Sequence, residues 1–146
     1  MVDGLVVADT DLVIDFLRGR DPGAHWLEGA LRDGRLRLTA ITAFELRLGA
    51  DFLRRRKGIE ALLAGRSLPL DTSGALRAGE ALIALRREGR GIDIRDALVA
   101  GVCRRFDLPL ATRNVRHFAR VEGLRLEPIP PPNSEEIADS PGGGRA

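Results

Sequence analysis

One stretch decides the fold of this chain, Gly91-Ile-Asp-Ile-Arg-Asp-Ala-Leu-Val-Ala100. It predicts a helix that runs from Asp93 through Phe106 and is apolar enough after its first turn to be buried. Asp93 fits the N-cap position and Asp96 the third helical position, where free backbone N–H groups and the helix dipole favour negative charge. Helix capping alone explains either carboxylate. A chemical role for them requires further acidic residues that converge on the same place.

The composition is that of one globular domain. The chain has 146 residues, of which 44% are hydrophobic and 30% charged, and no apolar run approaches the roughly 18 residues that a membrane span needs. The N-terminal apolar stretch lacks a basic leader and is interrupted by Asp9 and Asp11, so we expect no signal peptide. A single cysteine, Cys103, excludes an internal disulfide and a thiolate metal cluster, and His25 and His117 are isolated. We therefore expect a cytoplasmic protein with no membrane association.

The charge balance does not by itself identify a partner. The net charge of +2 is too small to indicate nucleic-acid binding. The basic residues are almost all arginine, Lys57 being the only lysine. Arginine binds phosphate through its planar fork, but coding bias in a GC-rich gene gives the same composition. The densest basic run, residues 54–57, is typical of a solvated helix end.

Short apolar runs alternate with helical patterns along the chain, which predicts an α/β domain with a parallel sheet. The predicted strands are 5–8, 35–39, 68–70, 108–111 and 124–126, the third of them an edge strand because of its proline. The predicted helices are 11–17, 21–34, one from residue 42, 59–63, 71–87, 93–106 and a short one that holds Val115 and Phe118. Residues 1–128 form the domain, and the Pro/Gly-rich residues 129–146 are expected to be a disordered tail.

Three helix starts have recognisable signals. Thr10 or Asp11 is the expected cap of the first helix, and Pro22 the first residue of the second. Residues 42–45, Thr-Ala-Phe-Glu, match a capping box that opens the third helix. Helices 11–17 and 21–33 carry apolar residues beyond one narrow stripe, so we expect an exposed apolar surface for association there.

Four oxygen-bearing side chains fall at one predicted edge of the sheet. Asp9 follows the first strand, Glu45 lies in the first turn after the second, Asp96 opens the long helix and Asn114 follows the penultimate strand. The carboxyl ends of parallel strands meet at one edge, where ligands bind at the switch point. Each residue alone is explained as a helix cap or turn residue. Together they predict a site for a hard cation, Mg²⁺ or Mn²⁺.

The same residues resemble a known family. Residues 7–15, 42–46, 92–100 and 112–118 are similar in order and spacing to the motifs of the PIN domain, and most similar to those of VapC-type toxins of toxin–antitoxin pairs. The similarity extends from about Val2 to Pro128. It implies a PIN-like three-layer α/β/α fold with a mainly parallel central sheet. It also implies a Mg²⁺- or Mn²⁺-dependent endoribonuclease that forms a homodimer, cleaves RNA and is inhibited by a cognate VapB-type antitoxin.

The resemblance assigns roles to individual residues. Asp9, Glu45 and Asp96 match the family's three metal-binding acids, and Thr10 matches the hydroxyl residue after the first of them. Asn114 stands where many members carry a fourth acid, so the predicted catalytic set is Asp9, Glu45, Asp96 and Asn114. This departure leaves open whether one or two metal ions bind, and Asp93 is an alternative source of the missing charge.

The mechanistic hypothesis is that Asp9 and Asp96 hold the principal ion. Glu45 then orients the attacking water or completes a second ion that arrives with substrate. Candidate contacts to the RNA backbone are Arg18, Arg20, Arg54, Arg55, Arg56 and Arg113. The chain has no tyrosine and few other aromatic residues, so platforms for base stacking are scarce and the RNA target is not specified.

Two alternatives belong to other functional classes. Asp9-Thr-Asp11 after an apolar strand also resembles the start of a haloacid-dehalogenase-type phosphatase, but that class needs a catalytic lysine and a downstream acid pair. Lys57 lies in the basic run and the chain has no Asp-Asp pair. The stronger alternative is an inactive PIN-like module that only binds RNA or a protein partner. Asn114 favours it, and the presence of Asp9, Glu45 and Asp96 together argues against it.

Overall fold

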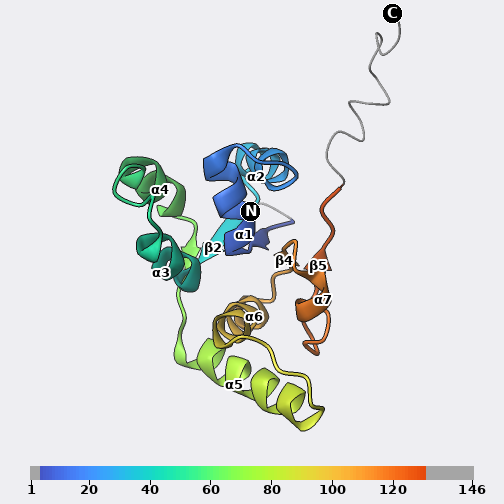
Figure 1. Cartoon of the computed structure of the whole chain (residues 1–146). Helices are drawn as coiled ribbons and strands as arrows, with labels where there is room; N and C mark the ends of the chain where they lie inside the picture. The colour runs from blue at the N-terminus through green and yellow to red at the C-terminus, as the bar shows by residue number, and fades with distance from the viewer. Residues whose placement is uncertain (1–3, 131–146) are drawn as a thin grey trace, which may run out of the picture.

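Five parallel strands form the sheet at the centre of the molecule (Figure 1). The structure is a computed structural model and describes residues 4–130. The sheet has the order β3-β2-β1-β4-β5, and every neighbouring pair is parallel. The strands are β1 (Val6–Ala8), β2 (Leu36–Thr39), β3 (Ser67–Leu68), β4 (Leu110–Ala111) and β5 (Leu126–Glu127). The predicted α/β class and the edge position of the third strand are confirmed.

Helices cover both faces of this sheet, which gives three layers. They are α1 (Thr10–Arg18), α2 (Gly23–Arg32), α3 (Ala40–Leu48), α4 (Arg56–Leu63), α5 (Thr72–Arg87), α6 (Ile94–Phe106) and α7 (Val115–Phe118). Figure 1 shows α1 and α2 on one side of the strands and α5 and α6 on the other. None of the helices within residues 4–130 combines the length and the apolar character that crossing a membrane requires.

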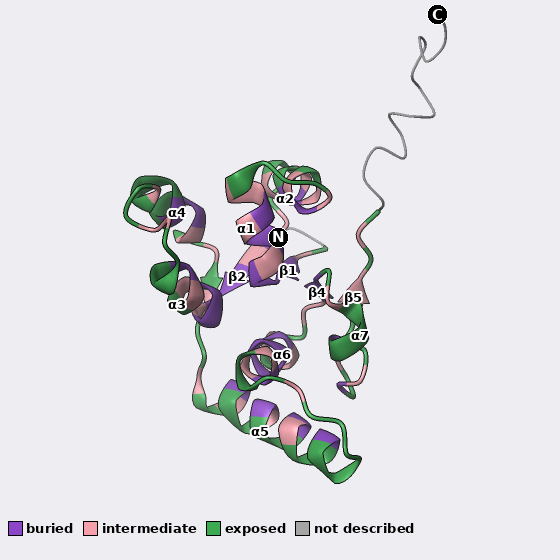
Figure 2. Cartoon of the chain, viewed as in Figure 1, coloured by how far each residue is buried: buried purple, intermediate pink, exposed green. Residues whose placement is uncertain are grey.

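Alternation along β1 divides the core into two clusters. Val6 and Ala8 pack with the apolar residues of α1, α2 and α4, while Val7 packs with those of α5 and α6. Successive residues of a strand point to opposite faces, so a strand that is apolar at every position is buried on both sides. Figure 2 shows the central strands buried, with the outer turns of α5 exposed.

The order of the strands creates a switch point beside β1. The chain passes from β1 outward to β2 and β3, and then crosses to β4 and β5 on the other side of β1. Neighbouring connections therefore leave the carboxyl ends of β1 and β4 in opposite directions, and the crevice between them is where ligands bind in such sheets.

Close packing of α5 against α6 sets the position of the first turns of α6, where Asp96 lies. A side chain at Gly101 on α6 would collide with the carbonyl oxygen of Gly74 and with Ala78 on α5. The Nε atom of Arg105 also donates to Asp71 Oδ2 at 2.8 Å. These contacts fix α6, and with it Asp96, relative to α5.

Three predicted helix starts need correction. The cap of α1 is Asp9, whose Oδ1 accepts the Thr10 N–H, and not Thr10 or Asp11. The second helix begins at Gly23, so Pro22 precedes it as its N-cap. The capping box at residues 42–45 is wrong, because Thr39 at the end of β2 caps α3 directly.

The expected apolar surface also lies elsewhere. The exposed large apolar side chains within residues 4–130 lie outside α1 and α2, at Phe44, Leu48, Leu53, Leu70, Leu76, Ile83, Ile94 and Val115. The extra apolar residues of α1 and α2, among them Ile14, Phe16 and Trp26, pack against the core. The predicted disordered tail falls largely on residues 131–146, which lie outside the described residues.

Candidate metal and active site

Asp9 is held between β1 and β4. Its Oδ1 accepts the Thr10 N–H at 2.9 Å, and its Oδ2 accepts the hydroxyl of Thr112 at 2.7 Å. The residue is only 8% exposed. Burial raises the pKa of Asp9 to about 7, and the negative charges of Asp11 and Asp96 act in the same direction. Without a cation nearby, this carboxyl group is therefore partly protonated at neutral pH.

Asp96 lies in the first turn of α6, after the N-cap Asp93, whose Oδ1 accepts the Arg95 N–H at 2.8 Å. Partial burial raises the pKa of Asp96, and the charges of Asp93 and Glu45 raise it further. His117 and Arg95 oppose the shift. The cap predicted for Asp93 is confirmed, and its charge also acts on the site.

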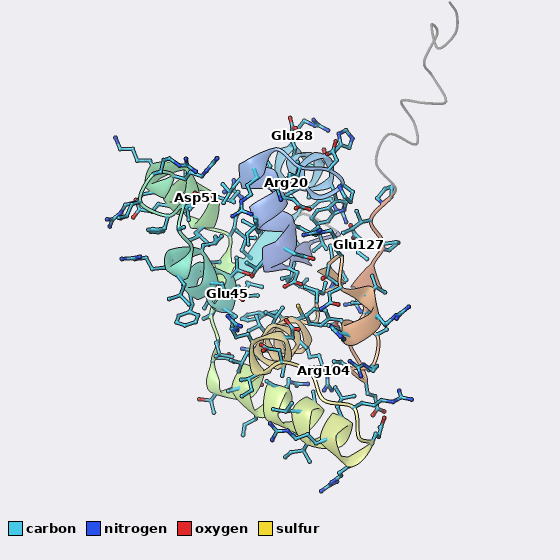
Figure 3. All side chains as sticks on the ribbon, viewed as in Figure 1. Arg20, Glu28, Glu45, Asp51, Arg104 and Glu127 are labelled. Atoms are coloured by element: carbon cyan, nitrogen blue, oxygen red, sulfur yellow. The ribbon has the colours of Figure 1, made fainter. Side chains whose placement is uncertain are left out.

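Glu45 lies in the second turn of α3, one turn later than predicted (Figure 3). Its Oε1 accepts the Thr10 hydroxyl at 2.7 Å. The Thr10 oxygen in turn lies 2.8 Å from that of Thr42. The second carboxylate oxygen of Glu45, Oε2, is 3.6 Å from Arg95 Nη1. Thr10 therefore joins the acid of α3 to the start of α1.

Asn114 is linked to Asp9 through its backbone and Thr112. Its N–H donates to the Thr112 hydroxyl oxygen at 2.9 Å, and that hydroxyl donates to Asp9. Its side chain does not cap α7.

Among the described residues, Asp9 and Asp96 are without an ion-pair partner. Four neighbouring acids each have an arginine, because Arg95 pairs with Glu45 and Asp93, and Arg113 with Asp11 and Asp15. The four paired acids share only two arginines, so the cluster as a whole stays negative. Within it, Asp9 and Asp96 have raised pKa values and no arginine partner among the described residues.

The oxygen donors of the site fit the predicted hard cation. Within residues 4–130, no three His, Cys, Asp or Glu side chains are already arranged to enclose an ion. Magnesium does not need such an enclosure, because it is usually held by one or two carboxylates together with water and substrate phosphate. Two carboxylates without an arginine partner in residues 4–130, Asp9 and Asp96, fit that manner of binding, whereas Glu45 contacts Thr10 and Arg95.

Sequence reasoning missed two residues of the site. Thr112 holds Asp9, and the signal was its position directly after β4, the strand beside β1. His117 was set aside as isolated, yet its charge lowers the pKa of Asp96. No sequence spacing reveals the latter, because His117 is on α7 and Asp96 on α6.

The predicted RNA-contacting arginines fall into two groups. Arg18, Arg20, Arg54 and Arg56 are exposed, and Figure 3 labels Arg20 between α1 and α2. Arg113 is exposed as well and, like Arg18, Arg54 and Arg56, lies in an ion pair, in its case with Asp11 and Asp15. Arg55 is half-buried and donates to the Leu17 carbonyl oxygen.

Comparisons with known proteins agree with this geometry. The PIN domain family model matches residues 6–124. Ribonuclease VapC10 of Mycobacterium tuberculosis is 34% identical over 121 residues, which cover 83% of this chain and 91% of that protein. The tRNA(fMet)-specific endonuclease VapC of Shigella flexneri is 31% identical over 124 residues, covering 82% and 93%. A crystal structure of DNA-bound VapBC from Salmonella typhimurium superposes with a TM-score of 0.73 at 27% identity, covering 84% of this chain and 96% of that one. The chain therefore belongs to the PIN domain family, and within it to the VapC-type ribonucleases.

Proposed function

We propose that this chain is a Mg²⁺- or Mn²⁺-dependent endoribonuclease and the toxin of a toxin–antitoxin pair. The observation that carries the proposal is the pair Asp9 and Asp96, two acids at the switch point of the sheet with raised pKa values and no arginine partner among the described residues. The ribonuclease and endonuclease names of its VapC relatives support the reaction class.

In this proposal, Asp9 and Asp96 hold the principal cation, and Glu45 orients the attacking water or completes a second site. The bound cation would neutralise charge on the phosphate and make water a better nucleophile. In the hydrolysis a water oxygen bonds to phosphorus, the bond from phosphorus to one ester oxygen breaks, and that oxygen takes up a proton. Thr112 and Thr10 keep the carboxylates of Asp9 and Glu45 in place.

The partners follow from the same assignment. The VapBC structures among the similar proteins support a VapB-type antitoxin as the partner of this chain. The exposed arginines of α1 and α4 are candidate contacts to RNA phosphate. We also propose a homodimer that acts in the cytoplasm, and the exposed apolar residues Phe44, Leu48 and Ile94 are a candidate surface for association.

The test is cleavage of a mixed structured RNA by antitoxin-free protein, with Mg²⁺ or with EDTA, beside Asp96→Asn. We expect cleavage that needs the metal and falls by about a hundredfold or more in the variant. Asp107→Asn is the matched control, because Asp107 is an exposed acid at the other end of α6.

Other outcomes would change the assignment. Cleavage that survives in Asp96→Asn would remove Asp96 from the metal site. No cleavage by wild-type protein that still binds RNA or a partner would favour the inactive PIN-like module. The phosphatase alternative is not favoured, since Lys57 is exposed on α4 and forms no ion pair with the site acids within residues 4–130.

A further inference from the structure

Arg113 lies between two residues that form the site, Thr112 and Asn114. Its backbone N–H donates to Asp11 Oδ2 at 3.0 Å. Its side-chain Nε lies 3.6 Å from the same oxygen and 3.2 Å from Asp15 Oδ2. Both acids are on α1, so this one residue ties the segment after β4 to the helix that Asp9 caps.

Asp15 depends on this arginine. Its side chain is only 6% exposed, and its Oδ2 makes no hydrogen bond in the described part of the chain. The carboxylate packs against Gly23, the first residue of α2, where a Cβ would collide with it, so this side chain is enclosed on its α2 side. A buried carboxylate without a partner is unfavourable. Arg113 is therefore kept at α1 by the charge that it neutralises.

We propose that Arg113 is a positioning residue of the active site, which holds residues 112–114 against α1 so that the Thr112 hydroxyl reaches Asp9. The inference rests on the proposed function for its effect on cleavage. It replaces the sequence-based expectation that Arg113 contacts the RNA backbone.

Two consecutive hydrogen bonds, from Asn114 to Thr112 and from Thr112 to Asp9, support this role. The Asn114 N–H donates to the Thr112 oxygen, and the Thr112 hydroxyl donates to Asp9 Oδ2. A shift of the segment would therefore turn the Asp9 carboxylate as well as move Asn114. Misplacement of a catalytic group by about 1 Å costs rate rather than substrate affinity.

The experiment uses four variants of the full chain: Arg113→Gln, Asp15→Asn, the double variant, and Arg116→Gln. Arg116 is the matched control, because it is exposed on α7 and makes no ion pair within residues 4–130. Four quantities are measured: kcat and KM for RNA cleavage, the salt dependence of RNA binding, the affinity for Mn²⁺ without RNA, and hydrogen exchange of the Asn114 amide.

We expect Arg113→Gln to lower kcat by about tenfold or more with KM within about twofold of wild type. Its Mn²⁺ affinity falls and its Asn114 amide exchanges faster, while the salt dependence of RNA binding is unchanged. Arg116→Gln behaves as wild type in kcat and in Asn114 exchange.

The double variant separates positioning from stability. It removes the stranded Asp15 charge, so its Tm recovers relative to Arg113→Gln. Its kcat stays low, because residues 112–114 are still not held against α1 by an ion pair. A kcat that recovers with Tm would overturn the proposal.

An RNA-contact role would give a different pattern. In Arg113→Gln, KM would rise, kcat would hold, and the slope of log K against log salt would lose about 0.7–0.9. If wild-type protein cleaves no RNA, the proposed function fails, and exchange of the Asn114 amide still decides the positioning role. Unchanged exchange in Arg113→Gln would reject it.

Discussion

Two of the aspartates that cap helices in this molecule, Asp9 and Asp71, have opposite electrostatics. Asp9 caps α1 through the Thr10 N–H, and Asp71 caps α5 through the Gly74 N–H at 2.8 Å. Burial raises the pKa of Asp9 to about 7. The Gly74 N–H and Arg105 instead lower the pKa of Asp71.

The difference separates an acid whose negative charge stabilises the fold from one whose negative charge destabilises it. Both side chains accept a backbone N–H, so capping does not distinguish them. Asp71 is accessible to solvent and has an arginine, which makes its negative charge favourable. Asp9 is buried among other acids without an arginine partner in residues 4–130, so its negative charge destabilises the fold.

The largest expected effect concerns the pH dependence of Asp9. Its folded-state pKa lies above the unfolded value of 3.8, so the folded state binds the extra proton and stability falls as pH rises from about 4 to about 7. The shift corresponds to about 4 kcal/mol. In Asp9→Asn we expect this loss to vanish, measured without divalent metal by urea unfolding across that range. An equally steep fall in the variant would place the titration elsewhere.

Asp71 is expected to give a smaller effect of opposite sign. Its stabilising contribution is present above the unfolded pKa and is lost as pH falls through the lowered folded value. Asp71→Asn keeps a cap oxygen but loses the charge that pairs with Arg105, so its Tm should fall by a few degrees at neutral pH. The difference in Tm between the variant and wild type should disappear at acidic pH, where Asp71 is protonated. A Tm deficit that is constant with pH would mean that only packing was disturbed.

The smallest expected effect tests whether Arg95 offsets part of the negative charge of the site. Arg95 lies 3.6 Å from Glu45 and is half exposed, so its influence is screened by solvent and salt. We expect Arg95→Gln to bind Mn²⁺ about two- to threefold more tightly at low salt, with less gain at high salt. Titration calorimetry measures it, and weaker binding would show that Arg95 helps to form the site.

Local patterns in the sequence were sufficient for the sheet and for two of the acids. Buried parallel strands are continuously apolar, and Asp9 directly follows one of them. Asp96 lies in the first turn of a helix whose cap, Asp93, was predicted correctly. These features depend on residues close together in the chain.

Other features depended on neighbours that the sequence does not specify. Residues 42–45 match a capping box by residue type, but β2 runs into α3 without a loop, so Thr39 takes that role. The bond from Thr112 to Asp9 depends on the register of β4 against β1. The ion pairs of Arg113 depend on how α1 is placed relative to the segment that follows β4.

The bond between Thr112 and Asp9 joins residues 103 positions apart. Asp96 also reaches the site only when α6 has packed on the sheet. During synthesis, which proceeds at about 5–20 residues per second, the first acid is made many seconds before the residues that complete its surroundings. A growing chain therefore has no assembled acidic site until β4 has paired with β1.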